Sequence, residues 1–343
     1  MRIMIGMGHP KDVHFWKNII NNLANNGHEI KIVAWDKDVT LYLLDTYGFS
    51  YEVLGKSCKS LIGKAYRLSK AGLISLKIAK KFEPDILIGR EPNLAHISKL
   101  IRRPFIMISD TEHATLSHLL TYPFSDAICT PLCFEGKINP RKHITFKGYQ
   151  ELAYLHPNYF KPDSSILSDL ELSKNDTFII LRFISWSASH DVGHHGFTNK
   201  EQLVRKLKEY GRVFIIPERE VIKKLGNHKM LIPPEKIHDL LYYATMYVGE
   251  GATMASESAI LGTPAIYVNT LRLGYLDELE KKYDLVYNFN TKNAQKYAIK
   301  KAIELLQDKN LKNRWRRKRD KLLKESVDVT AWMTIFIENY SRR

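Results

Sequence analysis

Residues 249–268 read GEGATMASESAILGTPAIYV and place a glycine-rich turn directly before the start of a predicted helix. The apolar residues 246–248, MYV, form a predicted strand that leads into this turn. Gly251 allows the backbone to turn sharply and lets a ligand approach closely. A helix that begins at Ala252 presents unpaired N–H groups at its first turn, and such groups bind anions. Strand, turn and helix in this order predict an α/β domain with an anion site.

The spacing along this helix suits a nucleotide. The N–H groups of Ala252, Thr253 and Met254 are placed to bind phosphates, and Glu257 lies about 7–8 Å further along at 1.5 Å per residue. This is about the reach from a diphosphate to the ribose of the same nucleotide, and a carboxylate accepts hydrogen bonds from a vicinal diol. Glu250 must then point away from the phosphates. The alternative is a tight strand–helix turn whose small residues only pack the helix on the sheet.

The composition bounds the class of protein. A chain of 343 residues with 44% hydrophobic and 26% charged residues is expected to fold as two globular α/β domains. It contains no apolar run long enough for a transmembrane helix and no signal peptide is expected. Three cysteines are too few for a disulfide framework, and the spacing of CTPLC, 129–133, does not suit zinc. A cytoplasmic location is expected.

Apolar runs alternate with amphipathic stretches along most of the chain, which predicts parallel sheets covered by helices. The pattern lapses near 156–176, where two prolines and several turn formers indicate a connection between domains. The predicted fold class is therefore α/β, with two Rossmann-like domains of similar size that face a cleft. The expected strands are 2–7, 28–35, 51–54, 85–89, 104–109, 126–130, 177–183, 212–217, 246–250 and 264–268.

The opening stretch resembles the ribose–diphosphate motif of GT-B-fold nucleotide-sugar enzymes, and is similar to SGG-x-x-E-E-x-x-x-LG-x-P of UDP-N-acetylglucosamine 2-epimerases. When residues 261–264, LGTP, are aligned with that motif, Glu257 falls on the glutamate that holds the UDP ribose. Gly251, Ala252 and Thr253 then fall on the small residues that bind phosphate. The family serine is Gly251 here and a family glycine is Thr253, so the backbone must donate more of the hydrogen bonds.

The whole chain resembles a largely archaeal family of unknown function within the GT-B superfamily, on the stretches GHPKDVHFWK (8–17), DTEHA (110–114) and SASHD (187–191). The resemblance implies a GT-B fold in which the apolar last helix crosses back to the first domain. The implied domains are an N-terminal acceptor domain (1–160), a C-terminal nucleotide-sugar domain (172–326) and the returning helix (327–343).

Residues 6–20, GMGHPKDVHFWKNII, resemble the glycine-rich first loop of MurG-type glycosyltransferases, which faces the acceptor. His9 and His14 are candidates for a catalytic base because histidine titrates near neutral pH, and each could equally be an ordinary loop or helix residue. A helix is expected to start near Asp12 or Val13, with Asp12 as its N-cap. The G-x-G-x-x-G fingerprint is missing here, so no nicotinamide cofactor is expected.

Two further loops follow predicted strands of the first domain: GREPN (89–93) and SDTEHA (109–114). In the 2-epimerases, acids after these two strands carry the chemistry, and by position Glu91 and, more closely, Glu112 resemble them. Arg90 could simply neutralise Glu91. In the second loop, Asp110 could serve only as the N-cap of a helix over 113–120.

The first loop of the second domain, SWSASHDVGHHGF (185–197), approaches the diphosphate in GT-B enzymes. Arg182, Ser187 and His190 are therefore candidates for phosphate contacts. In the same fold the helix before the MYVGE strand seats the base, which makes Ile237 a candidate backbone contact. A metal site is disfavoured because its candidate ligands are crowded into one loop. Those ligands are His190, Asp191, His194 and His195.

The net charge of +15 favours an anionic partner such as a phosphorylated substrate or a membrane surface. The densest basic run is KNLKNRWRRKRDKLLK (309–324), whose spacing places Leu311, Trp315 and Leu322 toward the core. The run is interpreted as a solvated helix face or as a peripheral membrane contact. No nucleic-acid-binding module accompanies it, so nucleic acid is not expected.

Together these observations predict an enzyme that uses a nucleotide sugar, with UDP-sugar favoured, and transfers the sugar to a phosphorylated or lipid-linked acceptor. His14 or Glu112 is the expected acid–base group of this transfer. One alternative is an epimerase or hydrolase resembling the UDP-N-acetylglucosamine 2-epimerases. Another is a nucleotide-sugar-binding protein without catalysis. No cofactor and no metal are expected, and the sequence leaves a homodimer open.

Overall fold

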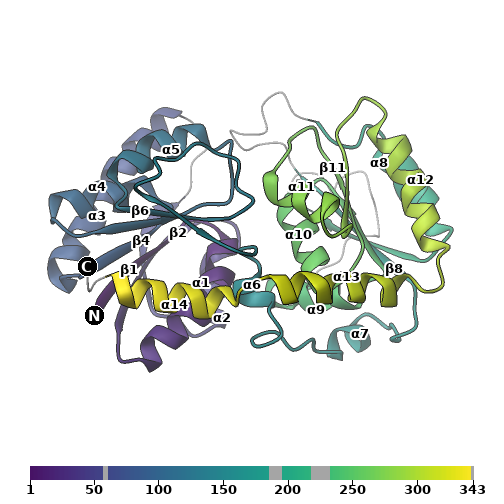
Figure 1. The fold of residues 1–343 in the computed structure, drawn as a ribbon, viewed down its shortest axis with the longest axis horizontal. Coiled ribbons are helices and arrows are strands. Elements are labelled where there is room, and N and C mark those ends of the chain that lie inside the picture. Colours follow the sequence, from purple (N-terminus) through teal and green to yellow (C-terminus); the bar gives the residue numbers. More distant parts are fainter. Residues whose placement is uncertain (57–60, 185–194, 218–231, 341–343) are drawn as a thin grey trace. The chain divides into compact units, whose positions relative to one another are not determined.

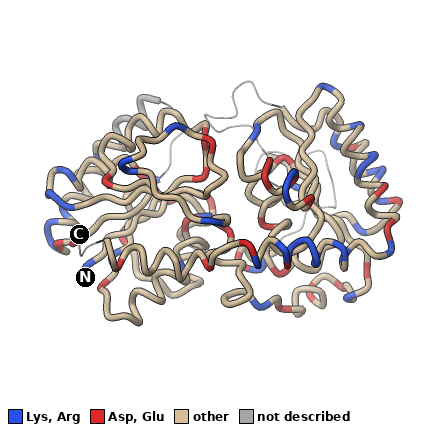
Figure 2. Tube along the Cα trace, viewed as in Figure 1, with Lys and Arg blue, Asp and Glu red and all other residues tan. Residues whose placement is uncertain are grey.

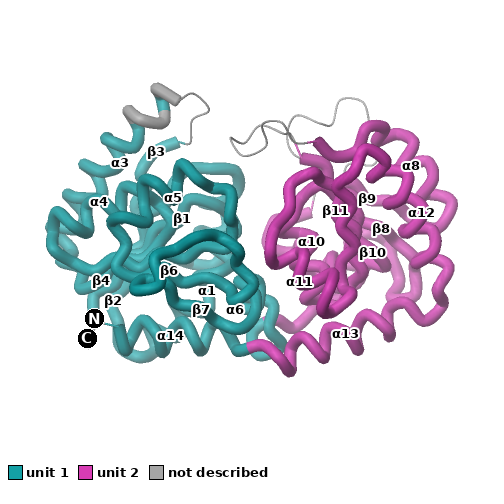
Figure 3. The backbone as a smooth tube through the Cα atoms, turned by 45° about the horizontal axis from the view of Figure 1, so that its top comes forward, with its two compact units in different colours: residues 1–159, 327–343 teal, residues 160–326 magenta. Residues whose placement is uncertain are grey.

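Two parallel β-sheets organise the chain, and each belongs to one of the two units of the computed structural model (Figure 3). Unit 1 comprises Met1–Tyr159 and Val327–Arg343, and unit 2 comprises Phe160–Ser326. The structure describes residues 1–56, 61–184, 195–217 and 232–340.

Unit 1 contains a seven-stranded sheet in which all neighbouring strands are parallel, in the order β3-β2-β1-β4-β5-β6-β7. The central strands are buried over nearly their whole length, as expected for a parallel sheet covered on both faces. The strands are β1 (Arg2–Met7), β2 (Glu29–Asp36), β3 (Tyr51–Lys56), β4 (Ile86–Gly89), β5 (Phe105–Ile108), β6 (Ala127–Pro131) and β7 (His143–Phe146).

Helices cover both faces of this sheet (Figure 1). On one face lie α1 (Pro10–Asn25), α2 (Thr40–Thr46), α6 (Leu152–Leu155) and α14 (Val329–Tyr340). On the other lie α3 (Leu61–Phe82), α4 (Pro92–Leu100), α5 (Thr115–Thr121) and the short 3₁₀ helix η1 (Tyr122–Phe124).

The last helix, α14, belongs to unit 1, which explains why the chain ends in so apolar a segment. Its buried residues Val329, Met333 and Ile337 pack in the part of unit 1 that contains α1 and α6. The Thr330 hydroxyl donates to the carbonyl of Ala153 at 2.7 Å, which fixes the helix start. The expected return of the last helix to the first domain is therefore confirmed.

Within the described residues, no helix has the length and apolar character needed to cross a membrane.

Unit 2 contains a five-stranded parallel sheet in the order β12-β11-β10-β8-β9. Helices α8 and α12 pack together on one face, and α10 packs with α9, α11 and α13 on the other (Figure 1). The strands are β8 (Phe178–Phe183), β9 (Arg212–Pro217), β10 (Met246–Gly249), β11 (Ala265–Val268) and β12 (Val286–Phe289). The helices are α7 (Ser165–Asp169), α8 (Lys200–Lys208), η4 (Pro234–Lys236), α9 (Ile237–Tyr243), α10 (Ala252–Leu261), α11 (Gly274–Lys281), α12 (Ala294–Leu306) and α13 (Leu311–Glu325).

Helix α10 is short and ends at a backbone conformation that only glycine adopts without strain. Gly262 has φ 79°, in the left-handed region, and follows the last helical residue. The N–H of Thr263 donates to the carbonyl of Ser258 at 2.8 Å, which satisfies an end carbonyl of the helix. The sequence LGTP thus stops α10 and starts β11. Ala255 and Ala259 are fully buried and allow the helix to lie close to the sheet.

Candidate functional site

Each sheet has one point where the strand order reverses, and the sequence-predicted motifs follow the strands on either side of it. In unit 1 the reversal lies between β1 and β4, and in unit 2 between β8 and β10. Connections leave such neighbouring strands toward opposite faces, so a crevice opens at their carboxyl ends, where ligands bind in this class of sheet. The opening motif of unit 2, at Gly249–Gly251, stands at this point.

The start of α10 is accessible, whereas the rest of the helix is buried. Gly251 caps the helix in an extended conformation (φ −91°, ψ 116°), and residues 251–254 are half-exposed. From Ala255 to Leu261 every residue is buried. The first-turn N–H groups of Ala252, Thr253 and Met254 therefore face a position that an anion can reach. Their role in phosphate binding stays a prediction.

Close packing explains the glycine at 249 and places Arg182 beside the helix start. A Cβ at Gly249 would lie 2.3 Å from the Tyr247 hydroxyl oxygen and 2.9 Å from the carbonyl oxygen of Arg182. The Tyr247 hydroxyl donates to the carbonyl of Gly251 at 3.0 Å, and burial raises the pKa of this tyrosine. A Cβ at Gly251 would lie 3.5 Å from Cγ of Arg182. Arg182 therefore lies beside the start of α10, and its contact with a phosphate stays a prediction.

The Glu250 carboxylate is turned into the protein and is 1% exposed. It accepts hydrogen bonds from the N–H groups of Ile184 at 3.0 Å and Phe197 at 2.8 Å, and lies 3.6 Å from the Lys200 ammonium. Burial raises the pKa of Glu250, and Lys200 opposes this shift. Because the carboxylate holds both ends of the β8–α8 connection, its charge is directed into unit 2, as an anion site at Gly251 requires.

Glu257 is hydrogen-bonded to His238, which was not predicted from the sequence. Its Oε1 atom lies 3.0 Å from Nε2 of His238, and the two residues are 5% and 3% exposed. His238 is the second residue of α9 and follows Ile237, the predicted base contact. The predicted ribose and base contacts are therefore brought together, although 20 residues separate them in the chain. No local pattern in PPEKIHDLL signals this pairing.

In unit 1, Glu91 lies in a crevice made by three glycines at the carboxyl ends of β1 and β4. A Cβ at Gly6, Gly8 or Gly89 would lie 2.3, 2.7 or 2.6 Å from a Glu91 carboxylate oxygen. The residue is 7% exposed. The carboxyl group occupies the place next to the glycine-rich loop where an anion would otherwise approach. This arrangement does not suit a dinucleotide phosphate.

The environment of Glu91 raises its pKa to about 7, because the carboxyl group is buried and lies near the Asp12 carboxylate. The Arg90 N–H donates to Glu91 at 3.1 Å and partly opposes this shift. The guanidinium of Arg90 instead makes ion pairs with Asp12 at 3.0 Å and Asp110 at 3.3 Å. A carboxyl group with a pKa near neutrality can both give and accept a proton.

A buried ion network surrounds this crevice. Lys11 lies between Asp110, with which it makes a short ion pair, and Glu151 at 2.9 Å. Although burial alone would raise it, Lys11 and Arg90 lower the pKa of Asp110 to about 2. Asp110 is therefore a network residue, and α5 begins after Ala114, so the alternative that Asp110 caps this helix is wrong. The network was missed because its members come from segments that are far apart in the chain.

His9 caps α1, which corrects the expected helix start. The helix begins at Pro10, and Nδ1 of His9 accepts from the Lys11 N–H at 3.2 Å. Asp12 lies in the first turn and accepts from the Gly8 N–H at 3.0 Å. The expectation of a start near Asp12 with Asp12 as N-cap is wrong, because proline at the first helical position is already fixed at a helical φ. His9 itself is exposed.

His14 and Glu112 lie in different surroundings from Glu91. His14 is buried, stacks on Tyr154 with ring centroids 5.5 Å apart, and has Nδ1 3.3 Å from the Tyr47 hydroxyl. These contacts favour a packing role for His14. Glu112 is half-exposed, and its Oε1 accepts from the N–H of Glu135 at 3.4 Å. Catalysis by His9, His14 or Glu112 stays a prediction.

Two predicted phosphate contacts, Ser187 and His190, lie outside the described residues, as do Asp191 and His194 of the metal alternative. Among the residues that the structure describes, no group of three histidine, cysteine or carboxylate side chains is arranged to hold a metal ion.

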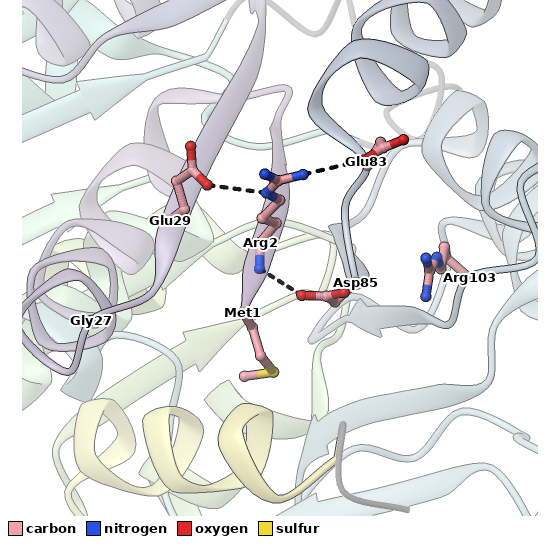
Figure 4. A pocket seen from close by; sticks show the side chains of 7 residues that line it. All are labelled: Met1, Arg2, Gly27, Glu29, Glu83, Asp85 and Arg103. Atoms are coloured by element: carbon pink, nitrogen blue, oxygen red, sulfur yellow. Dashed lines mark hydrogen bonds and ion pairs between the residues drawn. The ribbon is translucent and has the colours of Figure 1, made fainter.

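A depression of about 440 Å³ lies at the amino ends of the unit 1 strands, around the start of β1 (Figure 4). Arg2 pairs there with Glu29 at 3.2 Å and Glu83 at 3.4 Å, and all three side chains are well exposed. Exposed pairs of this kind contribute little to stability. None of the predicted site residues lines the depression, so it receives no functional assignment. The lining residues are Met1, Arg2, Gly27, Glu29, Glu83, Asp85 and Arg103.

Residues 1–332 match a protein family described as "Protein of unknown function (DUF354)". The chain belongs to this family. The chain is also 25% identical over 277 residues to the uncharacterized protein MJ0665 of Methanocaldococcus jannaschii, a match that covers 77% of this chain and 80% of the relative. The expected membership in a family of unknown function is confirmed.

Solved structures with the same fold are sugar-nucleotide epimerases and glycosyltransferases. UDP-GlcNAc 2-epimerase from Neisseria meningitidis bound to UDP-GlcNAc covers all of both chains, with a TM-score of 0.68 and 12% identity. The M. jannaschii UDP-GlcNAc 2-epimerase in complex with UDP-GlcNAc and UDP has a TM-score of 0.65 and 15% identity over 93% of this chain and 99% of that one. Spinosyn rhamnosyltransferase SpnG has a TM-score of 0.63 and 12% identity over 98% and 100%. The GT-B fold of the DUF354 chain is thereby confirmed.

Replacing Glu91 with Gln should stabilise the protein at pH 8 by on the order of 3 kcal/mol. Folding raises the pKa of this carboxyl from 4.5 to about 7. The stability that wild type has with a protonated Glu91 is therefore fully present below pH 4.5 and is lost as the pH rises through 7, whereas the uncharged glutamine loses none. Urea unfolding of wild type and Glu91→Gln between pH 5 and 8 measures the difference, which should grow with pH.

The matched control is Glu52→Gln on β3, since Glu52 is exposed. It should change the free energy of unfolding little and equally at every pH. A pH-independent difference between Glu91→Gln and wild type would contradict the raised pKa.

Proposed function

We propose that this DUF354 protein binds a nucleotide sugar, with UDP-sugar favoured, through unit 2. The carrying observation is the accessible start of α10 at the strand-order reversal, with Glu257 of the same helix bonded to His238 next to Ile237. Phosphate, ribose and base contacts would then follow one another along α10 and the start of α9. Related folds whose structures hold UDP or UDP-GlcNAc support this proposal.

We propose further that the protein is a glycosyltransferase whose unit 1 binds a phosphorylated or lipid-linked acceptor. Glu91 is the best-supported acid–base group because its pKa of about 7 suits proton transfer near neutral pH. Its carboxylate also lies against the glycines at the carboxyl ends of β1 and β4, where the strand order reverses. His9, His14 and Glu112 remain the other candidates from the sequence. No cofactor enters this proposal.

An epimerase or hydrolase that acts on the sugar nucleotide itself is the second candidate, because epimerases stand among the proteins with this fold. A glycosyltransferase should release UDP from its donor only when an acceptor is added, whereas an epimerase converts the donor alone. Product analysis of UDP-N-acetylglucosamine with and without acceptor separates the two.

In either reaction, Glu91→Gln should lower kcat about 10²–10⁴-fold, the usual size of an acid–base contribution, and leave UDP affinity nearly unchanged. Unaltered turnover in a folded Glu91→Gln protein would remove Glu91 from the chemistry. Binding without any product would favour the third alternative, a nucleotide-sugar-binding protein.

Donor binding is tested by calorimetric titration with UDP, and with ADP, GDP and TDP for comparison. Glu257→Ala should weaken UDP binding by roughly 1.5–3 kcal/mol, the scale of hydrogen bonds to a charged group. The control is Glu304→Ala on α12, an exposed glutamate in the same unit, which should leave affinity unchanged. Equal affinity of wild type and folded Glu257→Ala would contradict the ribose contact, and failure of every nucleotide to bind would overturn the proposal.

We also propose that α13 contacts an anionic membrane surface, where a lipid-linked acceptor would lie. Leu311, Trp315 and Leu322 are buried, as the sequence predicted, and the Trp315 indole N–H donates to the carbonyl of Leu285 at 2.9 Å. The exposed positions of α13 are mainly basic, and Figure 2 shows lysine and arginine positions along the helix. The exposed basic residues of α13 are Arg314, Arg316, Arg317, Lys321 and Lys324.

Reversal of two of these charges, in Arg316→Glu/Arg317→Glu, should weaken binding to phosphatidylglycerol-containing vesicles by about 2–4 kcal/mol, since each basic residue near an anionic surface contributes about 1 kcal/mol. Vesicle sedimentation measures this. The control is Lys296→Glu/Lys300→Glu on α12, which makes the same charge change at exposed positions of unit 2. Equal loss in both variants would show a general charge effect, and persistent binding of the α13 variant would leave α13 as a solvated face.

A further inference from the structure

We propose that His238 is a positioning residue that fixes the Glu257 carboxylate, and that the pair makes unit 2 select ribonucleoside diphosphates over their deoxyribose analogues. The inference rests on the proposed nucleotide site and adds to it the residue that makes the site specific for ribose. Its basis is the buried hydrogen bond between Nε2 of His238 and Oε1 of Glu257, at 3.0 Å.

The chemistry of the pair fixes which atom donates. A carboxylate only accepts hydrogen bonds, so Nε2 of His238 carries the hydrogen. Both side chains are almost fully buried, in surroundings where such a bond is stronger than in water. A carboxylate offers about four acceptor positions on its two oxygens. The bond with His238 therefore orients Glu257 without exhausting its capacity to accept from a diol.

Helix α9 holds His238 in a defined place. The Phe160 ring stands edge-on to the imidazole, with centroids 6.4 Å apart. The neighbouring Asp239 carboxylate accepts from the N–H of Asp163 at 2.8 Å, which ties α9 to the first segment of unit 2. At its other end, the carbonyl of Leu241 accepts from the Thr263 hydroxyl at 2.7 Å. Because α9 is anchored on both sides, the imidazole can act as a fixed donor.

A fixed donor matters because glutamate has several rotatable side-chain bonds. A carboxylate that must be immobilised on ligand binding loses affinity, whereas one already held by a second residue does not. A site built to hydrogen-bond a hydroxyl also rejects the analogue that lacks it, since its buried polar group is left unpaired. His238 therefore affects the ribose hydroxyls specifically, and leaves the first turn of α10 and its phosphate contacts unchanged.

The same bond joins two subsites. Ile237 precedes His238 at the start of α9, and Glu257 lies on α10, so the bond spans the predicted base and ribose contacts. Loss of the imidazole donor would let the carboxylate turn away from the diol. The observable consequence is a change in preference among ligands that differ only in ribose hydroxyls.

The test is calorimetric titration of the full chain with UDP and 2′,3′-dideoxy-UDP. Wild type should prefer UDP by tenfold or more. His238→Leu should reduce this preference to less than threefold, with little change in affinity for dideoxy-UDP. His238→Gln, whose side-chain amide places a donor near the position of Nε2, should restore most of the preference. Thermal unfolding of each variant shows whether it is folded.

A histidine that only supports the fold would move both ligands together and would not be rescued by glutamine. The inference is overturned if folded His238→Leu keeps the wild-type preference, or if it loses affinity for UDP and dideoxy-UDP equally. If His238→Leu does not fold, the Gln variant decides, because retention of the preference supports the inference and its loss overturns it. If wild type binds UDP but shows no preference, the ribose role of Glu257 fails and the inference with it. If wild type binds neither UDP nor ADP, GDP or TDP, the proposed function itself fails.

Discussion

The reversal of strand order in each parallel sheet is the constraint on which both candidate sites depend. A right-handed crossover sends the chain to one face after β1 or β8 and to the other face after β4 or β10, so backbone ends diverge there and a crevice opens. Glycines occupy these ends because neighbouring atoms leave no room for a Cβ at Gly6, Gly89 or Gly249. The position of each site is thus fixed by topology, and its chemistry by the few side chains that reach the crevice.

The two crevices use a buried carboxyl group in opposite ways. In unit 2, Glu250 turns inward and accepts from the N–H groups of Ile184 and Phe197, which leaves the partial positive charge of the α10 start available to an anion. In unit 1, Glu91 fills the glycine crevice itself. One fold therefore provides a position suited to a diphosphate in unit 2 and a position suited to proton transfer in unit 1.

The sequence predicted those features that depend on neighbours in the chain. Strand–helix alternation predicted the two parallel sheets, and the glycine-rich turn predicted the helix that begins at Ala252. Features set by distant segments were missed, namely the ion network around Lys11 and the bond between His238 and Glu257, because hydrogen bonding across helices leaves no periodic pattern. The cap of α1 was misassigned because Asp12 is a common N-cap residue, whereas proline at position 10 had already begun the helix.

The ion network explains how Glu91 keeps a raised pKa although Arg90 is the next residue. The guanidinium of Arg90 makes ion pairs with Asp12 and Asp110, which offset most of its effect on Glu91. The Asp12 carboxylate also raises the pKa of Glu91. Asp110, between Lys11 and Arg90, has its pKa lowered to about 2. The pKa values of the two acids are thus far apart, so that Asp110 stays ionised near neutral pH while Glu91 gains and loses its proton there, an arrangement that suits general acid–base chemistry. Lys11 pairs with Asp110, and Arg90 pairs with both Asp12 and Asp110, so these cations are held by the aspartates while the buried carboxyl group of Glu91 keeps its raised pKa.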